Sequence, residues 1–234
     1  MRRAATLNDG DIYTRGLTQG FETAFRDRGG EIVLSAAINK GDKEMKPVLT
    51  AVAAADAELL FFPLFQPEGN RVLRQARRMA DFNDIRLMSD GALIESSFLN
   101  NVGPLGIGMY FVGPSRPAGP TVDRLDREYA ARFGEKPATS YYLNAYDAAR
   151  LLIKAIETVA VEENQNPGRL HIGRQALRDV LYSARDVEGV AGTLACNEFG
   201  DCARPVFDVL RFDDPGGGVD ALQANVLFTY GPSE

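Results

Sequence analysis

The chain has 234 residues, of which 45% are hydrophobic, so it can bury the core of one large domain or of two smaller lobes. Its formal net charge of -6 at pH 7 argues against a nucleic-acid partner, because such a partner usually needs a basic protein face. No run of about 18 apolar residues occurs, so the sequence predicts no membrane-spanning helix.

The first residues, MRRAATLNDGDIY, contain two arginines but no apolar segment behind them, so they do not form a secretory signal. Either the protein is cytoplasmic, or its export signal was removed or lies outside this sequence. The segments that follow alternate between strand-like and helix-like patterns. The expected elements are a strand at 3–7, a helix at 13–28, a strand at 31–38, a helix near 48–53, a strand at 59–64, a helix at 68–80, a strand at 86–89, a short helix at 93–100 and a strand at 107–112.

The apolar run at 59–62 is unbroken, which is typical of a strand buried on both faces of a parallel sheet. Together with the alternation of strands and helices at short spacing, it predicts an α/β fold with a doubly wound parallel sheet.

The pattern changes at Gly113, where the segment GPSRPAGP is typical of a linker or hinge. Beyond it we expect mainly helices. Helices of an α/β fold pack on a sheet, and this section has almost no strands of its own. Either these helices pack on the first section, or their sheet comes from residues ahead of Met1; a fragment is the simpler account. The expected elements are helices at 121–133, 140–161 and 174–184, strand-like segments at 192–195 and 206–212, a Gly-rich turn at 216–218 and a last strand at 224–230.

The only two cysteines, Cys196 and Cys202, lie close together in LACNEFGDCARP. A hairpin would bring them within bridging distance, so we expect a disulfide and an oxidising compartment, with two free thiols as the alternative. Two cysteines without a nearby histidine cannot complete a zinc site, and the turn at 197–201 has too few oxygen ligands for calcium. We therefore expect no metal and no cofactor.

Three polar or aromatic residues stand at strand ends, where open parallel sheets bind ligands: Phe65, Gln66 and Asp90. Asp90 is the best partner for a positively charged ligand group, because an unpaired buried charge is very costly. The alternative is that Asp90 only caps the following helix. Glu95 could serve instead, but we expect it inside that helix and facing solvent.

Five segments, taken in order, resemble the type I periplasmic binding proteins, specifically the branched-chain amino-acid (leucine/isoleucine/valine) substrate-binding family of ABC transporters. Each segment alone is a weak signal, and their order over nearly the whole chain makes the resemblance fairly specific. They are DGDIYTRGLTQGFETAFRDRGGEI, PEGNRVLRQARRM, LMSDGALIESSFL, AYDAARLLIKAI and GTLACNEFGDCARPVFDVLRF.

The resemblance implies two α/β lobes that trap a ligand between them. Residues 1–113 would form the carboxy-terminal lobe, residues 114–205 the helical part of an incomplete amino-terminal lobe, and residues 206–234 would cross back to the first lobe. The family's amino-terminal portion has no counterpart in this sequence. Half of the ligand cleft would therefore be absent.

The resemblance also implies roles for individual residues. Asp90 matches the place of an acidic ligand group in the family, and an aromatic residue from the region of Tyr141 and Tyr142 lines the family's pocket. The alternative for both tyrosines is packing against a neighbouring helix. Tyr146 and Asp147 match an element that we interpret as structural. Loops in the position of Tyr13 line the cleft in the related fold, but we expect a capping loop with an exposed Tyr13.

We therefore expect the solute-binding component of an ABC importer, periplasmic or extracellular, which binds a small amino acid, or a related organic acid or amide, by hinge closure, with the permease as its partner. One alternative is a cytoplasmic ligand-sensing regulator of the same fold. A less favoured alternative is an enzyme on a doubly wound scaffold. The only histidine, His171, has no evident nucleophile or orienting residue in the sequence, and no P-loop or GxSxG motif occurs.

Overall fold

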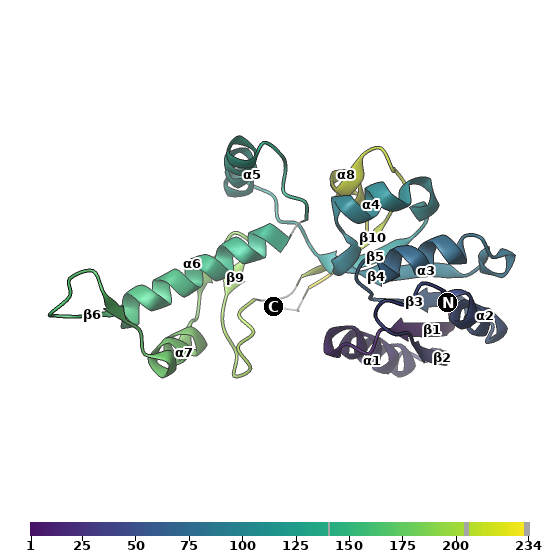
Figure 1. The fold of residues 1–234 in the computed structure, drawn as a ribbon, viewed down its shortest axis with the longest axis horizontal. Helices are drawn as coiled ribbons and strands as arrows, with labels where there is room; N and C mark the ends of the chain where they lie inside the picture. The colour runs from purple at the N-terminus through teal and green to yellow at the C-terminus, as the bar shows by residue number, and fades with distance from the viewer. Residues whose placement is uncertain (140, 204–205, 232–234) are drawn as a thin grey trace. The chain divides into compact units, whose positions relative to one another are not determined.

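The computed structural model describes residues 1–139, 141–203 and 206–231 of the chain (Figure 1). It divides into two compact units. Unit 1 comprises residues 1–115 and 207–230, and unit 2 comprises the described residues of 116–206 together with Gly231.

Unit 1 is built on a seven-stranded sheet of order β11-β10-β5-β4-β3-β1-β2. Its first five strands in sequence are parallel, whereas β10 runs antiparallel to β5, and β11 antiparallel to β10. The strand order reverses direction between β1 and β3, which is where doubly wound sheets bind ligands. The strands are β1 (Arg3–Asn8), β2 (Glu31–Ala37), β3 (Leu59–Phe61), β4 (Arg86–Asp90), β5 (Tyr110–Pro114), β10 (Phe207–Arg211) and β11 (Val226–Tyr230).

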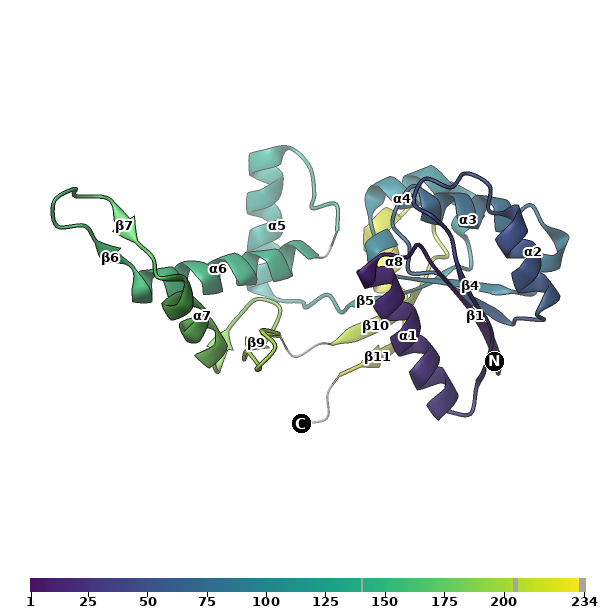
Figure 2. The same cartoon turned by 60° about the horizontal axis from the view of Figure 1, so that its bottom comes forward.

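Helices cover both faces of this sheet, as the doubly wound pattern predicts, so the expected fold class is confirmed. Helix α1 lies on one face, and the other four helices of unit 1 lie on the opposite face (Figure 2). The bounds of these helices are α1 (Ile12–Asp27), α2 (Lys46–Ala54), α3 (Glu68–Ala76), α4 (Ser96–Val102) and α8 (Gly218–Ala224), with short 3-10 turns at Ala80–Phe82, Gly91–Leu93 and Gly103–Gly106.

The larger hydrophobic core of unit 1 lies under the four-helix face and includes the fully buried Phe62, Phe98 and Phe111. The Phe98 and Phe111 rings meet edge to face, with their centroids 6.1 Å apart. On the other face, α1 packs through Phe21, whose ring stacks on Phe61 of β3 at 4.7 Å. The sheet is thereby packed on both faces.

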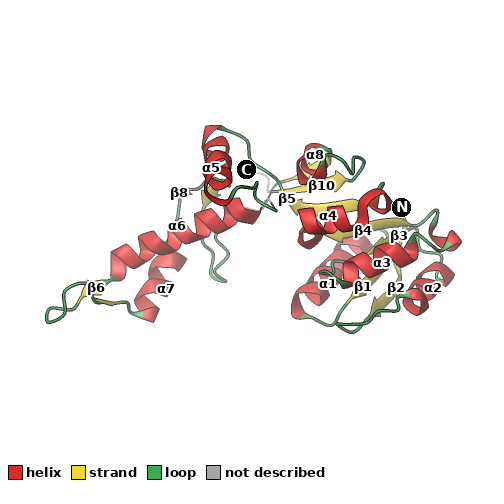
Figure 3. Ribbon diagram, turned by 45° about the horizontal axis from the view of Figure 1, so that its top comes forward, coloured by secondary structure: helices red, strands yellow, loops and turns green. Residues whose placement is uncertain are grey.

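Unit 2 consists of three helices and two short hairpins (Figure 3). Its buried apolar residues form two small clusters, one around Val122, Leu125 and Leu143 and one around Leu151 and Leu194. The elements are α5 (Pro120–Phe133), α6 (Tyr141–Val159), α7 (Arg174–Ser183), and the paired strands β6 (Val161–Glu162) with β7 (Leu170–His171) and β8 (Val187–Glu188) with β9 (Thr193–Leu194). The expected start of α6 at Ser140 lies outside the described residues.

Two differences from the predicted elements have a clear physical reason. The strand expected over 59–64 ends at Phe61, although Phe62 still donates its N–H to Met88, because Pro63 has no N–H to continue the ladder. The segment before the last strand is helical, whereas the sequence led us to expect only a turn there. Val219 and Leu222, three residues apart, bury the apolar side of this short helix α8.

Candidate functional site

The candidate site lies at the carboxyl ends of the parallel strands of unit 1. Asp90 is the last residue of β4, paired opposite Val112 of β5, and only 5% of its surface is exposed. The segment after the adjacent strand β3 carries Phe65 and Gln66. Strands β3 and β4 are parallel neighbours, so their carboxyl ends lie at the same edge of the sheet. Asp90 and the segment with Phe65 and Gln66 therefore follow adjacent strand ends.

The two carboxylate oxygens of Asp90 have different surroundings. Oδ2 accepts a hydrogen bond from the Tyr13 hydroxyl at 2.6 Å, whereas Oδ1 is buried and has no hydrogen-bond partner among the described residues. Burial raises the pKa of Asp90 above its ordinary value, and the Tyr13 hydroxyl, the backbone N–H groups of Ala92 and Asp90 and the Ser89 hydroxyl act in the opposite direction. A buried acceptor without a donor is unfavourable, so Oδ1 is suited to a donor from a ligand.

Tyr13 is exposed and follows the capping residue Asp11, as expected, and it also contacts the candidate site. Its ring remains 41% exposed, but its centroid lies 5.3 Å from that of Phe65, and its hydroxyl binds Asp90. The Asp11 side chain accepts the Tyr13 N–H and so fixes the first turn of α1. The sequence signal for this role is a tyrosine in the first turn of the helix after β1. That signal points to Asp90 only once the strand order, which puts β1 near β4, is known.

Gln66 and Glu95 form a second polar contact at the same edge. The Gln66 amide nitrogen Nε2 donates to Glu95 Oε1 and to Ser97 Oγ, and the Ser97 hydroxyl donates to Glu95. Our expectation for Glu95 was wrong, because this residue precedes α4 in an extended conformation and is only partly exposed. With its backbone extended, Glu95 places its side chain against Gln66, in the segment after β3.

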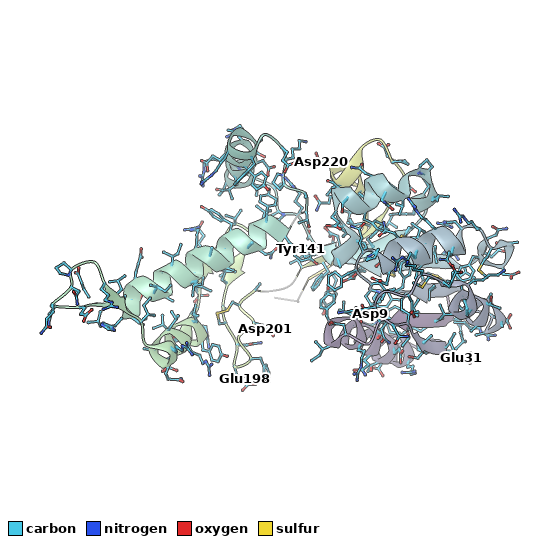
Figure 4. The ribbon with its side chains drawn as sticks, in the orientation of Figure 1. Asp9, Glu31, Tyr141, Glu198, Asp201 and Asp220 are labelled. Carbon is cyan, nitrogen blue, oxygen red and sulfur yellow. A yellow bond between two sulfur atoms is a disulfide. The ribbon has the colours of Figure 1, made fainter. Side chains whose placement is uncertain are left out.

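Tyr141, labelled in Figure 4, and Tyr142 lie in unit 2, at the start of α6. The Tyr142 hydroxyl donates to Asp126 of α5, which also accepts a hydrogen bond from Arg116 at 2.6 Å. Burial and the hydrogen bond to Asp126 both raise the pKa of Tyr142. These contacts are the packing that we gave as the alternative for Tyr142, and a ligand role for either tyrosine stays a prediction.

The expected disulfide is confirmed: the Cys196 and Cys202 sulfur atoms are 2.07 Å apart. The turn between them carries Glu198 and Asp201, both exposed (Figure 4). Asp147, which we interpreted as structural, is buried and accepts the N–H groups of Val190 and Ala191 at 2.8 and 2.7 Å.

The only histidine, His171, lies exposed in the β6–β7 hairpin, 3.7 Å from a Glu163 oxygen. Among the described residues, no group of three or more His, Cys, Asp or Glu side chains is arranged to hold a metal ion. None of the helices in the described ranges combines the length and apolar character that crossing a membrane requires.

Comparisons with known proteins give one consistent result. A family model described as "Periplasmic binding protein" matches residues 1–203. The chain is 25% identical over 213 residues to the Leu/Ile/Val-binding protein homolog 3 of Brucella melitensis, covering 91% of this chain and 55% of that protein. A leucine-, isoleucine-, valine-, threonine- and alanine-binding protein of Pseudomonas aeruginosa is 24% identical over 209 residues, which are 89% of this chain and 52% of that protein.

Solved structures agree in fold. The leucine binding protein LivK of Thermotoga maritima has a TM-score of 0.76 at 18% identity, covering 99% of this chain and 60% of that one. A solute binding protein of R. palustris, solved with benzoate, has a TM-score of 0.73 at 15% identity, covering 99% and 58%. The chain thus spans about half the length of the curated relatives it matches. These matches confirm the resemblance identified from the motifs.

Proposed function

Because the chain belongs to the periplasmic binding protein family, we propose that it is all or part of the solute-binding component of an ABC importer, with a small amino-acid-like ligand. The observation that carries this proposal is the buried oxygen Oδ1 of Asp90, which has no donor among the described residues. An ammonium group has three N–H donors and a positive charge, so it fits a buried carboxylate better than a neutral donor does.

The proposal includes the arrangement of the whole binding protein. Residues 1–113 correspond to the carboxy-terminal lobe, residues 114–205 to the helical part of the amino-terminal lobe, and residues 206–234 cross back to the first. The ligand is held by groups from both lobes, and its contacts favour the closed state of a hinge. Tyr141 and Tyr142 supply an aromatic wall, Phe65 and Gln66 line the strand ends, and Asp90 takes the ammonium.

The first test compares two ligands with one carbon skeleton. Leucine and 4-methylpentanoic acid differ in the ammonium group alone, so only leucine can use the charge of Asp90. For Asp90→Asn we expect leucine affinity to fall about 30-fold or more, because removing one partner of a buried charge pair costs about 2–5 kcal/mol, whereas binding of the acid changes little. Calorimetric titration of both ligands measures the difference.

The matched control is Asp208→Asn, which neutralises an aspartate of the same unit with the same 5% exposure, whose carboxylate accepts the Thr229 hydroxyl. This control variant keeps the preference for leucine. Equal losses for leucine and 4-methylpentanoic acid in Asp90→Asn would contradict the ammonium role.

The Cys196–Cys202 disulfide supports a periplasmic or extracellular location over a cytoplasmic ligand-sensing regulator, because disulfides are rare in reducing compartments. We therefore expect thiol titration of the natively produced protein, denatured without reductant, to find no free thiol. The same titration after reduction serves as the control and gives two thiols per chain. Two thiols before reduction would favour the regulator.

A further inference from the structure

The side-chain amide of Gln66 is held in one orientation. Its nitrogen end donates to the Glu95 carboxylate and to the Ser97 hydroxyl oxygen. An ionised carboxylate has no proton to donate, so it must face the NH₂ end of an amide and never its carbonyl end. The carbonyl oxygen Oε1 of Gln66 is therefore the end left for a ligand, and no described residue donates a hydrogen bond to it.

Several side-chain donors and cations near this edge are already engaged. The Tyr13 hydroxyl donates to Asp90, and the Ser97 hydroxyl donates to Glu95. Lys40, which follows β2, pairs with Asp11 at 2.7 Å. Arg71 of α3 binds Glu68 at 3.2 Å and the backbone oxygen of Asp42 at 2.7 Å. Two acceptors beside these groups have no donor among the described residues: Oδ1 of Asp90 and Oε1 of Gln66.

We propose that Glu95 and Ser97 determine the specificity of this site, by fixing the Gln66 amide so that it offers a ligand only its carbonyl oxygen. Unit 1 then recognises a donor-rich cationic end of the ligand, an ammonium group, and gives a carboxylate no partner. The inference rests on the proposed function in taking this sheet edge as the ligand site, and it adds the residues that set which end of the ligand unit 1 accepts.

The consequence is a choice between two classes of ligand. A free Gln66 amide could rotate to present its N–H groups, and it would then accept a carboxylate as readily as an ammonium group. With Glu95 in place, that rotation would set the Gln66 carbonyl oxygen against a carboxylate, which is repulsive. A molecule that is only an organic acid, such as benzoate, is therefore a poor ligand for unit 1.

The orientation of Gln66 is tested first in the ligand-free 234-residue chain by ¹⁵N NMR. Gln66→Met assigns the side-chain amide signals of Gln66, and Gln165, which lies exposed in a loop, is the internal reference. We expect the Gln66 amide protons to exchange at least about tenfold more slowly than those of Gln165. The double substitution Glu95→Ala with Ser97→Ala removes the difference, and Glu128→Ala, an exposed carboxylate of unit 2, retains it. Equal exchange for both glutamines in the unmodified chain overturns the proposal.

The second measurement uses two small probes with the same branched chain, 3-methylbutylamine and 4-methylpentanoate, at millimolar concentration. We expect the amine to shift the backbone amide signals of residues 89–95 and the carboxylate to leave them unchanged. In the double variant the amine binds about fivefold more weakly, as expected for the loss of about one hydrogen bond, and the carboxylate gains a response. A carboxylate response in the unmodified chain, no response to the amine, or an unchanged preference in the double variant overturns the proposal.

These results separate the two proposals. Protected Gln66 protons and an amine preference, without leucine binding by calorimetry, would support the role of Glu95 and Ser97 and reject the proposed transport ligand. Leucine binding that depends on Asp90, together with an unprotected Gln66 amide, would do the opposite.

Discussion

At the scale of single residues, the feature that matters most is a buried carboxylate with one oxygen left without a donor. A fold selected only for stability would give Asp90 Oδ1 a donor or replace the residue with a neutral one. Sites that bind ligands commonly keep such unfavourable groups, because the ligand supplies the missing partner. Asp90 therefore links the local energetics of unit 1 to its proposed function.

We expect Asp90→Asn to stabilise the ligand-free chain at pH 7 by about 1 kcal/mol, because burying an ionised carboxylate costs more free energy than burying an amide. The pKa of Asp90 is raised in the folded chain above its ordinary value of 3.8, so between these two pKa values the folded state holds the proton more strongly than the unfolded state. The stability of the unmodified chain consequently falls as the pH rises through that interval.

Urea unfolding of both chains between pH 3 and pH 7 measures the effect. The advantage of Asp90→Asn should be greatest at pH 7 and should shrink below the folded pKa of Asp90, where the carboxyl group is neutral. An advantage independent of pH, or a loss of stability at pH 7, would show that the Asp90 carboxylate is well satisfied in the folded chain.

At the scale of elements, Asp147 ties the long helix α6 to the β8–β9 hairpin. Its carboxylate accepts two consecutive backbone N–H groups, those of Val190 and Ala191. The close approach of the hairpin to Asp147 requires glycine at position 189. A Cβ there would lie 2.6 Å from Asp147 Oδ2 and 2.7 Å from the Gly192 carbonyl oxygen. Helix and hairpin are thus joined by a polar contact where their apolar contacts are few.

We expect Asp147→Ala to destabilise unit 2 by about 3 kcal/mol, because it leaves two partly buried N–H groups without an acceptor. Hydrogen exchange of the amides at 187–194 should rise, and the thermal transition of unit 2 should move to lower temperature. The control is Asp179→Ala on α7, an exposed residue whose carboxylate accepts only from the neighbouring Gln175. Similar effects of the two substitutions would mean that the Asp147 contacts contribute little.

At the scale of the whole molecule, the two units differ in how much apolar surface they bury. The core of unit 1 includes residues of β1, β3, β4, β5 and β10, whereas unit 2 has two small clusters, and α7 has no fully buried residue. Burial of apolar surface is the main favourable term in folding, so the units should differ in stability.

We therefore expect native-state hydrogen exchange to separate the units. The amides of β1, β3 and β4 should be protected close to the global limit, and those of α7 should exchange through local opening at least about a hundredfold faster. Mass spectrometry of peptic fragments across a denaturant series measures both. Equal protection of α7 and β3 would show that unit 2 is stabilised by contacts beyond its own clusters.

The order of the elements follows from local patterns that the sequence displays directly. The apolar run at 59–62 and the alternation around it predicted buried parallel strands, since a strand covered on both faces must be apolar throughout. Cys196 and Cys202 are close enough in sequence for a hairpin to join them. Helix α8 was not predicted because only two residues, Val219 and Leu222, carry its apolar pattern.

The composition of the candidate site depended on contacts between distant segments. The sequence by itself identified Phe65, Gln66 and Asp90 as residues at strand ends, because the end of an apolar run is a local signal. Only the tertiary structure joined Tyr13 to Asp90, across 77 positions in the chain, and turned Glu95 towards Gln66. The physical reason is strand order: β3 lies between β1 and β4, so the loops after these strands meet at one edge, and the spacing of residues along the chain does not record which strands are neighbours.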